Sequence, residues 1–191
     1  TDPLVLQTVV ENTRAAGIVV VVSAGNAGPG CGSVNDPPGI YDASFSVGAT
    51  DSSDGIASFS SRGPVTVDGS NRAKPDVSAP GVSVRSSTRT SDTSYGSLSG
   101  TSMAGPHVAG LVALLMSKSP ALVGQPEIVK RHVQNSSKFL VGSQTCGGVP
   151  GTARPNTTFG FGRVRAVSPH DIAIDTDGNA RSEAIIYRNG A

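Results

Sequence analysis

Hydrophobic positions along the chain follow two patterns, helical spacing and short unbroken runs. Residues 5, 6, 9 and 10 are apolar and predict one face of a helix. Pro3 fits the first turn of this helix, and Gly17 fits its C-terminal end. The run Ile18–Val22 follows at once, and its consecutive β-branched residues predict a strand that is buried on both faces. A helix that leads directly into such a strand is typical of an α/β fold.

Further segments are predicted from the same patterns. Residues 44–50 alternate enough for a strand, and residues 56–64 predict a short strand that ends at a Gly-Pro pair. Residues 83–97 are rich in serine and threonine, which predicts an exposed loop. Residues 102–117 are apolar on every face and predict a buried helix, whereas residues 126–135 predict a helix with one apolar face and a proline in its first turn.

Composition narrows the class of protein. A length of 191 residues suits one domain, and 4% aromatic residues without tryptophan imply a core of valine, alanine, leucine and isoleucine. The net charge of +1 gives neither the basic footprint of a nucleic-acid-binding protein nor a polybasic membrane patch. No apolar run reaches the roughly 18 residues that cross a bilayer. We therefore expect no nucleic-acid partner and no membrane partner.

The two cysteines, Cys31 and Cys146, each lie in a loop rich in glycine and proline. Neither belongs to a Cys-x-x-Cys pattern or has a histidine beside it, which argues against a zinc or redox site. We interpret them as one disulfide between distant loops, which suits a secreted or extracellular protein. Two free buried thiols are the alternative.

Candidate chemistry lies in the stretch Ser99–Gly110, where a loop turns into the predicted buried helix. Ser102 is placed at the helix N-terminus, among unpaired N–H groups and partial positive charge. That position suits a nucleophile whose reaction produces an oxyanion, although for Thr101 or Ser102 taken alone a helix cap is the favoured interpretation. Asn26 follows the first predicted strand, at the end where α/β sheets bind ligands, but by itself it is an ordinary turn residue.

The residues around both positions favour the chemical interpretation. Residues 100–110 read Gly-Thr-Ser-Met-Ala-Gly-Pro-His-Val-Ala-Gly and closely resemble the nucleophile motif of the subtilisin-like serine proteases, the subtilases. Residues 20–26, Val-Val-Val-Ser-Ala-Gly-Asn, resemble a second motif of that family, and the segments 47–52, 57–64, 74–81 and 159–167 resemble others. The resemblance covers residues 1–167, which match the C-terminal half of a subtilase catalytic domain.

The resemblance implies a three-layer αβα fold with a mostly parallel sheet, incomplete in this chain. It implies a serine endopeptidase that hydrolyses peptide or protein substrates through an acyl-enzyme on Ser102. Asn26 then donates to the oxyanion together with the Ser102 N–H, and Ser23, Ala24 and Gly25 form a wall of the substrate cleft. No cofactor is implied for catalysis.

The family's aspartate and histidine motifs, and its Ser-Leu-Gly-Gly segment, have no counterpart here. His107 lies five residues after Ser102, about 140° around a helix, and in the family it is structural, as is Asp76. His132 and His170 are no better placed as a catalytic base. We therefore expect the chain alone to be inactive and to have the missing N-terminal half as its partner. Without that half, an exposed sheet edge would favour a dimer.

Residues 168–191 differ in kind from the rest. Asp175, Asp177, Asn179 and Glu183 take positions 1, 3, 5 and 9 of a loop between two short apolar strands. This spacing of oxygen atoms suits a structural Ca²⁺ ion and resembles one FG-GAP or VCBS-type repeat, whereas a plain hairpin turn explains it equally well. A non-catalytic pseudoprotease scaffold and a calcium-binding adhesion module are the alternative functions. Intact Ser102 and Asn26 favour the enzyme.

Overall fold

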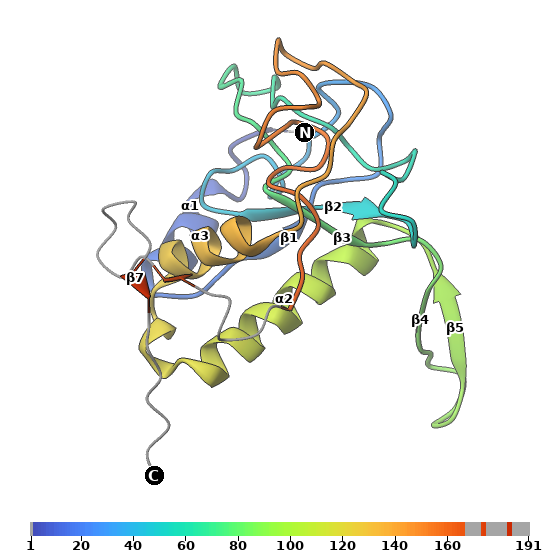
Figure 1. Ribbon diagram of the computed structural model, residues 1–191, viewed down its shortest axis with the longest axis vertical. Helices are drawn as coiled ribbons and strands as arrows, with labels where there is room; N and C mark the ends of the chain where they lie inside the picture. The colour runs from blue at the N-terminus through green and yellow to red at the C-terminus, as the bar shows by residue number, and fades with distance from the viewer. Residues whose placement is uncertain (1, 167–172, 175–182, 185–191) are drawn as a thin grey trace.

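A parallel sheet forms the centre of the computed structural model (Figure 1). The structure describes residues 2–166, 173–174 and 183–184. The sheet has the order β1 (Val21–Ser23), β2 (Phe45–Thr50) and β3 (Val77–Pro80). All residues of the central strand β2 are buried, and Val47 pairs with Ser23 on one side and with Val77 on the other. The predicted α/β class with a parallel sheet is confirmed.

Helices lie against this sheet on both sides of β1. The helices are α1 (Gln7–Ala15), α2 (Thr101–Lys118) and α3 (Pro126–Ser136), with a single 3₁₀ turn, η1 (Pro120–Leu122). Helices α2 and α3 share the main hydrophobic cluster with β2 and β3, and Val19 and Val21 pack against it. Val20 packs instead against a second cluster that contains Val10 of α1, as alternation along a strand requires.

The opposite face of β2 and β3 carries small residues, against which loops pack. Ser60 Oγ accepts a hydrogen bond from the Ala49 N–H at 3.0 Å, and Ser78 Oγ donates to the Phe159 carbonyl oxygen at 3.0 Å. A Cβ atom at Gly48 would lie 3.1 Å from Pro75 and 3.3 Å from Ser60 Oγ. The segments around residues 60 and 159 therefore lie directly on the sheet.

The first predicted helix is shorter and less buried than expected. Asp2 Oδ1 accepts a hydrogen bond from the Leu4 N–H in a separate turn, and the helix begins only at Gln7. Gly17 follows the helix end with φ of 85°, as predicted. On the expected apolar face only Val10 is buried. Most of that face is exposed, as its relative accessibilities show: Val5 59%, Leu6 39% and Val9 56%.

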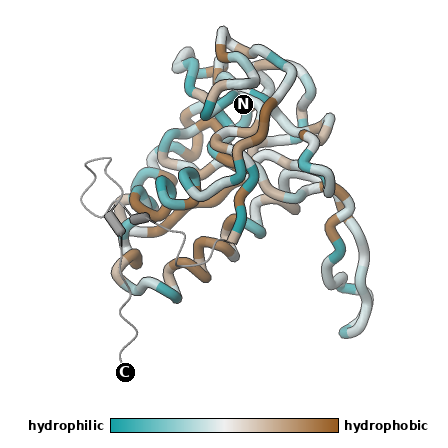
Figure 2. Tube along the Cα trace, viewed as in Figure 1, coloured by the Kyte–Doolittle hydropathy of each residue, from teal (hydrophilic) through white to brown (hydrophobic). Residues whose placement is uncertain are grey.

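Two predictions of full burial are wrong for the same physical reason. Strand β1 is half-buried because, among the described strands, it lies at the edge of the sheet and pairs with β2 alone. Helix α2 buries one face, with Ala104, Val108 and Val112, while Leu114 on the other face is 68% exposed. Figure 2 shows hydrophobic colour along much of α2. The apolar residues of β1 and α2 therefore outnumber those that the described residues bury.

Two loop regions also differ from expectation. Residues 56–64 form turns rather than a strand, with Ile56 alone making a bridge to Thr50. Residues 83–97 contain most of an antiparallel hairpin of β4 (Val84–Ser87) and β5 (Tyr95–Leu98), which projects from the body in Figure 1. Arg85 stacks 4.0 Å over the Tyr95 ring across this hairpin. The polar composition of residues 83–97 correctly predicted that this segment is exposed, but it gave no indication that two strands pair there.

The predicted tail strands pair with each other. β6 (Ala173–Ile174) and β7 (Glu183–Ala184) are antiparallel. The expected calcium loop lies outside the described residues, as do the side chains of Asp175, Asp177, Asn179 and Glu183. Within the described part of the chain, no helix is long and apolar enough to cross a membrane. The described residues likewise contain no group of three or more metal-ligating acidic, histidine or cysteine side chains.

Candidate active site

The carboxyl ends of the three parallel strands meet the N-terminus of α2 at one edge of the sheet. Asn26 follows the end of β1 by three residues, and Gly81 follows β3 directly. The Gly100 N–H donates to the Gly81 carbonyl oxygen at 2.8 Å, which fixes the loop before the helix to the sheet. Ser102 is then the second residue of α2 and is exposed. This is the edge at which open α/β sheets bind ligands.

Asn26 caps α2 from a distance. Its Oδ1 accepts hydrogen bonds from the Thr101 N–H at 2.9 Å and from the Thr101 hydroxyl at 3.0 Å. The residue at the N-cap position is Gly100, which has no side chain to do this. The cap interpretation of Thr101 and Ser102 is therefore wrong, because both lie inside the helix and another segment satisfies its first N–H group.

Two N–H donors remain free beside this contact. Because Oδ1 is directed at Thr101, the Nδ2 amide of Asn26 is left as a donor. A Cβ atom built on Gly100 would lie 3.7 Å from this Nδ2 and 3.7 Å from the Ser102 nitrogen, so the two donors flank one point. Among the described residues neither donor has a hydrogen-bond acceptor. Together with the positive end of the helix, they can stabilise a negatively charged oxygen.

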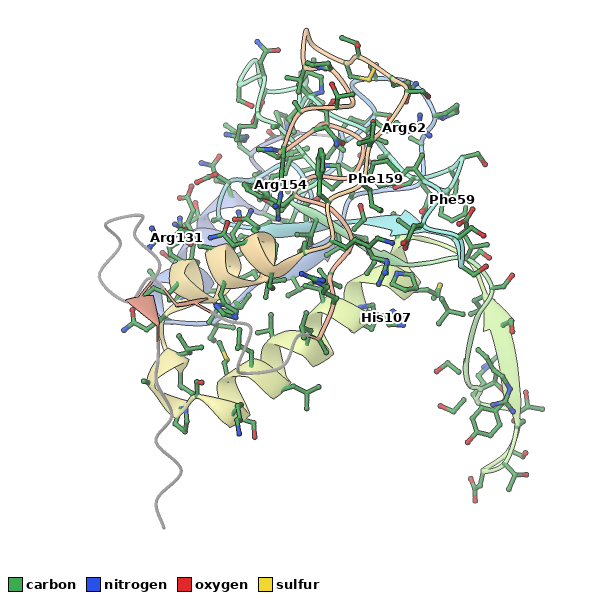
Figure 3. All side chains as sticks on the ribbon, viewed as in Figure 1. Phe59, Arg62, His107, Arg131, Arg154 and Phe159 are labelled. Atoms are coloured by element: carbon green, nitrogen blue, oxygen red, sulfur yellow. A yellow bond between two sulfur atoms is a disulfide. The ribbon has the colours of Figure 1, made fainter. Side chains whose placement is uncertain are left out.

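No histidine of the described residues forms a hydrogen bond with Ser102. His107 is exposed on α2, and its Nδ1 lies 2.9 Å from the Met103 carbonyl oxygen (Figure 3). His132 is buried in α3, where burial lowers the pKa of its imidazole. His170 lies outside the described residues. The arrangement around Ser102 thus contains a hydroxyl and oxyanion donors but no adjacent base.

Asp76 belongs to a buried structural cluster at the other edge of the sheet. Its carboxylate accepts hydrogen bonds from the Ser46 N–H at 2.7 Å and from Lys74 Nζ at 2.6 Å, and Lys130 Nζ lies 3.0 Å away. Burial lowers the pKa of the Lys74 ammonium, and the neighbouring carboxylate opposes that effect. This position, before the start of β3, agrees with the structural interpretation of Asp76.

The three residues of the expected cleft wall have different surroundings. Ser23 lies at the end of β1, where its Oγ is 3.8 Å from the position that a Cβ at Gly105 would occupy. Ala24 is buried in the second hydrophobic cluster. Gly25 is partly exposed with φ of 104°. Ser23 and Gly25 therefore reach the surface beside Asn26, whereas the Ala24 side chain faces the interior.

The predicted disulfide between Cys31 and Cys146 is present, with 5.4 Å between the Cα atoms and a sequence separation of 115. The same two loops are joined by a hydrogen bond from Gln144 Nε2 to the Pro29 carbonyl oxygen at 2.9 Å. Arg62 lies beneath them among the loops of Figure 3, and its guanidinium donates to Gln144 Oε1. The loop that follows Asn26 is thereby tied to the loop of residues 144–149.

Comparison with known proteins agrees with this geometry. Residues 2–162 match the model of the subtilase family, Peptidase_S8. The chain belongs to the subtilase family. Subtilisin DY of Bacillus licheniformis is 50% identical over 119 residues, which are 61% of this chain and 39% of the relative. Serine protease AprX of Bacillus subtilis is 41% identical over 155 residues, covering 71% of this chain and 33% of that protein.

The fold of the subtilase chain is also found in a solved structure. The prenylagaramide maturation protease PagA superimposes with a TM-score of 0.66 at 22% identity, over 84% of this chain and 52% of the other. Subtilisin amylosacchariticus of Bacillus subtilis subsp. amylosacchariticus is 45% identical over 71% of this chain and 32% of its own length. The chain thus spans 32–39% of the length of these three curated relatives.

Sequence reasoning identified Asn26 and Ser102 but missed how they are connected. The bond from Thr101 to Asn26 had no local signal, because a threonine inside a helix gives no indication of a partner 75 residues away. The contacts of Ser61 with the Asn26 loop were missed for the same reason. Only the three-dimensional packing of the segment around residue 60 brings Ser61 within 3.0 Å of the Ala27 nitrogen.

Proposed function

We propose that the protein to which this chain belongs is a serine endopeptidase of the subtilisin type, with Ser102 as nucleophile and Asn26 in the oxyanion hole. The observation that carries the proposal is the orientation of Asn26. Its Oδ1 is fixed on Thr101, so its amide donor and the Ser102 N–H flank one point at the helix N-terminus. An asparagine held only as a turn residue would not need this long-range contact.

The reaction follows from the roles of these atoms. The Ser102 hydroxyl oxygen attacks the carbonyl carbon of the scissile peptide bond, and its proton passes to a histidine base. The carbonyl oxygen becomes an oxyanion that accepts hydrogen bonds from Asn26 Nδ2 and the Ser102 N–H. When the C–N bond breaks, the amine leaves with the proton from the base. Water then hydrolyses the Ser102 ester and regenerates the hydroxyl.

The histidine base and the carboxylate that orients it are supplied, in this proposal, from outside the chain. The described histidines form no hydrogen bond with Ser102, and the chain spans 39% or less of the first relatives. The isolated chain is then inactive, since a serine hydroxyl without a base is a weak nucleophile. Peptides or proteins are the substrate class, and Ser23 and Gly25 line the cleft beside the nucleophile.

The complementary N-terminal half is the proposed partner, and uncovered apolar surface supports it. Leu114 is 68% exposed, Ile18 is 56% exposed, and β1 offers an unpaired sheet edge. A groove of about 460 Å³ runs beside α2 and is lined by Leu111, Leu114 and Val164 among others. Surfaces of this kind are normally covered. Without the complement, dimerisation through the same edge is the expected substitute.

Three further proposals concern the remainder of the chain. The catalytic segment comprises residues 1–167, and residues 168–191 begin a different segment. A structural Ca²⁺ ion binds the stretch of residues 175–183 through the four oxygen-bearing side chains named above. The protein is secreted, which the Cys31–Cys146 disulfide and the Bacillus relatives support. Calorimetric titration with Ca²⁺ tests the metal site, and a silent titration rules it out.

Hydrolysis of a denatured protein by the full-length enzyme tests the main proposal. The Ser102→Ala variant should lose all cleavage, because no other group can form the acyl-enzyme. Ser99→Ala is the matched control: this serine lies in the same loop, where its Oγ accepts a hydrogen bond from the Ser83 N–H at 2.9 Å. Cleavage by Ser102→Ala at the wild-type rate would overturn the assignment of the nucleophile.

A further inference from the structure

The loop that carries Asn26 is bound on both sides to one buried serine. Ser61 has no solvent exposure, and its N–H donates to the Gly25 carbonyl oxygen at 3.0 Å. The Ala27 N–H donates in turn to Ser61 Oγ at 3.0 Å. The Asn26 side chain is therefore fixed at Thr101, while the peptide units before and after Asn26 are fixed at Ser61.

Two glycines allow the loop to approach this closely. A Cβ atom at Gly25 would lie 2.9 Å from Ser61 Oγ, and one at Gly28 would lie 2.2 Å from the Ser60 carbonyl oxygen. The Gly28 N–H also donates to the Phe59 carbonyl oxygen at 2.8 Å. The loop of residues 25–28 thus lies flat on the segment of residues 59–61, with no space for a side chain between them.

That segment is itself anchored to the sheet and to neighbouring loops. Ser60 Oγ accepts the Ala49 N–H of β2 at 3.0 Å. The Gly63 N–H donates to the carbonyl oxygens of Lys74, at 3.0 Å, and Thr157, at 2.9 Å. Ser61 therefore connects the Asn26 loop to a segment that is itself held by hydrogen bonds to the sheet and to neighbouring loops.

We propose that Ser61 is a positioning residue for Asn26, holding its amide donor where the oxyanion forms. The proposal rests on the function proposed above for Asn26. Without the Ser61 hydroxyl, the Ala27 N–H loses its acceptor and the loop shifts away from the segment beneath it. A small displacement of an oxyanion donor weakens its bond in the transition state more than in the bound substrate. Ser61 therefore acts on kcat rather than on KM.

Steady-state kinetics of the full-length protein test this with adjacent serines. Ser61→Ala should lower kcat about tenfold and leave KM within about twofold. Ser60→Ala is the matched control, because it removes an equally buried hydroxyl that accepts a backbone N–H of β2 instead. It should lower the Tm to a similar extent but lower kcat clearly less than Ser61→Ala does, because the backbone hydrogen bonds of Gly28 and Gly63 still hold the segment in place.

A double-variant cycle separates positioning from general destabilisation. In an Asn26→Ala background the donor is already absent, so adding Ser61→Ala should cause no further loss of kcat. Independent losses that multiply, or equal losses of kcat in Ser60→Ala and Ser61→Ala, would overturn the proposal.

Hydrogen exchange gives a readout that does not need activity. The Thr101 N–H, bonded to Asn26 Oδ1, should exchange faster in Ser61→Ala than in wild type or Ser60→Ala. If the wild-type protein proves inactive, the proposed function fails, and this exchange alone decides the role of Ser61. Unchanged exchange at Thr101 in Ser61→Ala would refute it.

Discussion

Asn26 Oδ1 accepts hydrogen bonds from both the N–H and the hydroxyl of Thr101, at 2.9 and 3.0 Å, although 75 residues separate the two in the chain. This contact joins the end of the edge strand β1 to the start of the helix that carries Ser102. It satisfies a helix N–H and fixes which side of the Asn26 amide is free to donate. One side chain thereby stabilises the start of α2 and, in the proposed mechanism, also donates to the oxyanion.

Substitutions at Asn26 can separate these two contributions. Asn26→Asp keeps an oxygen acceptor for Thr101 and adds negative charge at a helix N-terminus, so the Tm should be maintained. It removes the amide donor, and kcat should fall about 10²–10³-fold, which is the magnitude already known for the corresponding asparagine of subtilisin, a relative.

Asn26→Ala removes acceptor and donor together, so it should lose both activity and about 1 kcal/mol of stability. Thermal melts and kcat of the two full-length variants make the comparison. Equal kcat in Asn26→Asp and wild type would remove Asn26 from the oxyanion hole.

The Cys31–Cys146 disulfide should contribute strongly to stability. It closes a loop over a separation of 115 residues, so reduction releases a large part of the unfolded chain. The Cys31→Ser/Cys146→Ser variant should have a free energy of unfolding lower by about 2–5 kcal/mol in the usual range for such bonds. Denaturant unfolding of this variant and of oxidised wild type measures the difference. Identical midpoints would mean that the loops are held by other contacts, such as the Gln144–Pro29 hydrogen bond.

Burial of His132 should make stability fall in mild acid. Desolvation lowers the pKa of its imidazole below the ordinary value of 6.5, so below pH 6.5 the unfolded chain binds a proton that the folded chain does not. Stability therefore decreases as the pH falls through that window, by up to about 1.4 kcal/mol per pH unit for one proton. Above pH 6.5 the effect disappears because both states are neutral.

Thermal melts at pH 7.5 and 5.5 measure this dependence. The Tm of wild type should fall more between the two pH values than the Tm of His132→Leu. His107→Gln, at an exposed histidine on the neighbouring helix, controls for the loss of a histidine as such. A wild-type Tm that falls no more than that of His132→Leu would argue against the buried neutral ring.

Much of the architecture could be predicted from residue patterns, and the errors have a common origin. The alternation of residues 44–50 predicted the strand β2 but not the burial of all its residues, and the start of α3 followed from Pro126. Strand β1 and helix α2 were predicted to be buried throughout because their composition suits a larger domain. The composition of a segment indicates how buried it is in the complete domain. Its exposure in this structure depends on which neighbouring elements the chain contains.

The candidate site divides in the same way. Ser102 and Asn26 carry local motifs, so the sequence alone is enough to propose their roles. Thr101 and Ser61 act through contacts with distant segments, at sequence separations of 75 and 34, and no local pattern encodes them. The hairpin of residues 84–98 was hidden by its serine and threonine content, which describes exposure better than backbone pairing.

The uncovered face of α2 should cause the isolated 191-residue chain to self-associate. Leu114→Lys places a charge on that face at a position already 68% exposed, so association should weaken without loss of folding. Val141→Lys, at a residue 61% exposed in a distant loop, is the matched control. Sedimentation velocity over a range of concentrations measures the change. A wild-type chain that stays monomeric at all concentrations would contradict the expectation of a missing partner.

Covalent labelling at Ser102 tests the central claim most directly. The full-length protein is treated with a fluorophosphonate, digested, and its peptides are identified by mass spectrometry. An activated serine is phosphonylated, so we predict an adduct on the peptide that contains Ser102, none in Ser102→Ala, and none in the isolated 191-residue chain, which has no base. An adduct at another serine, or labelling of Ser102→Ala equal to that of wild type, would contradict the account.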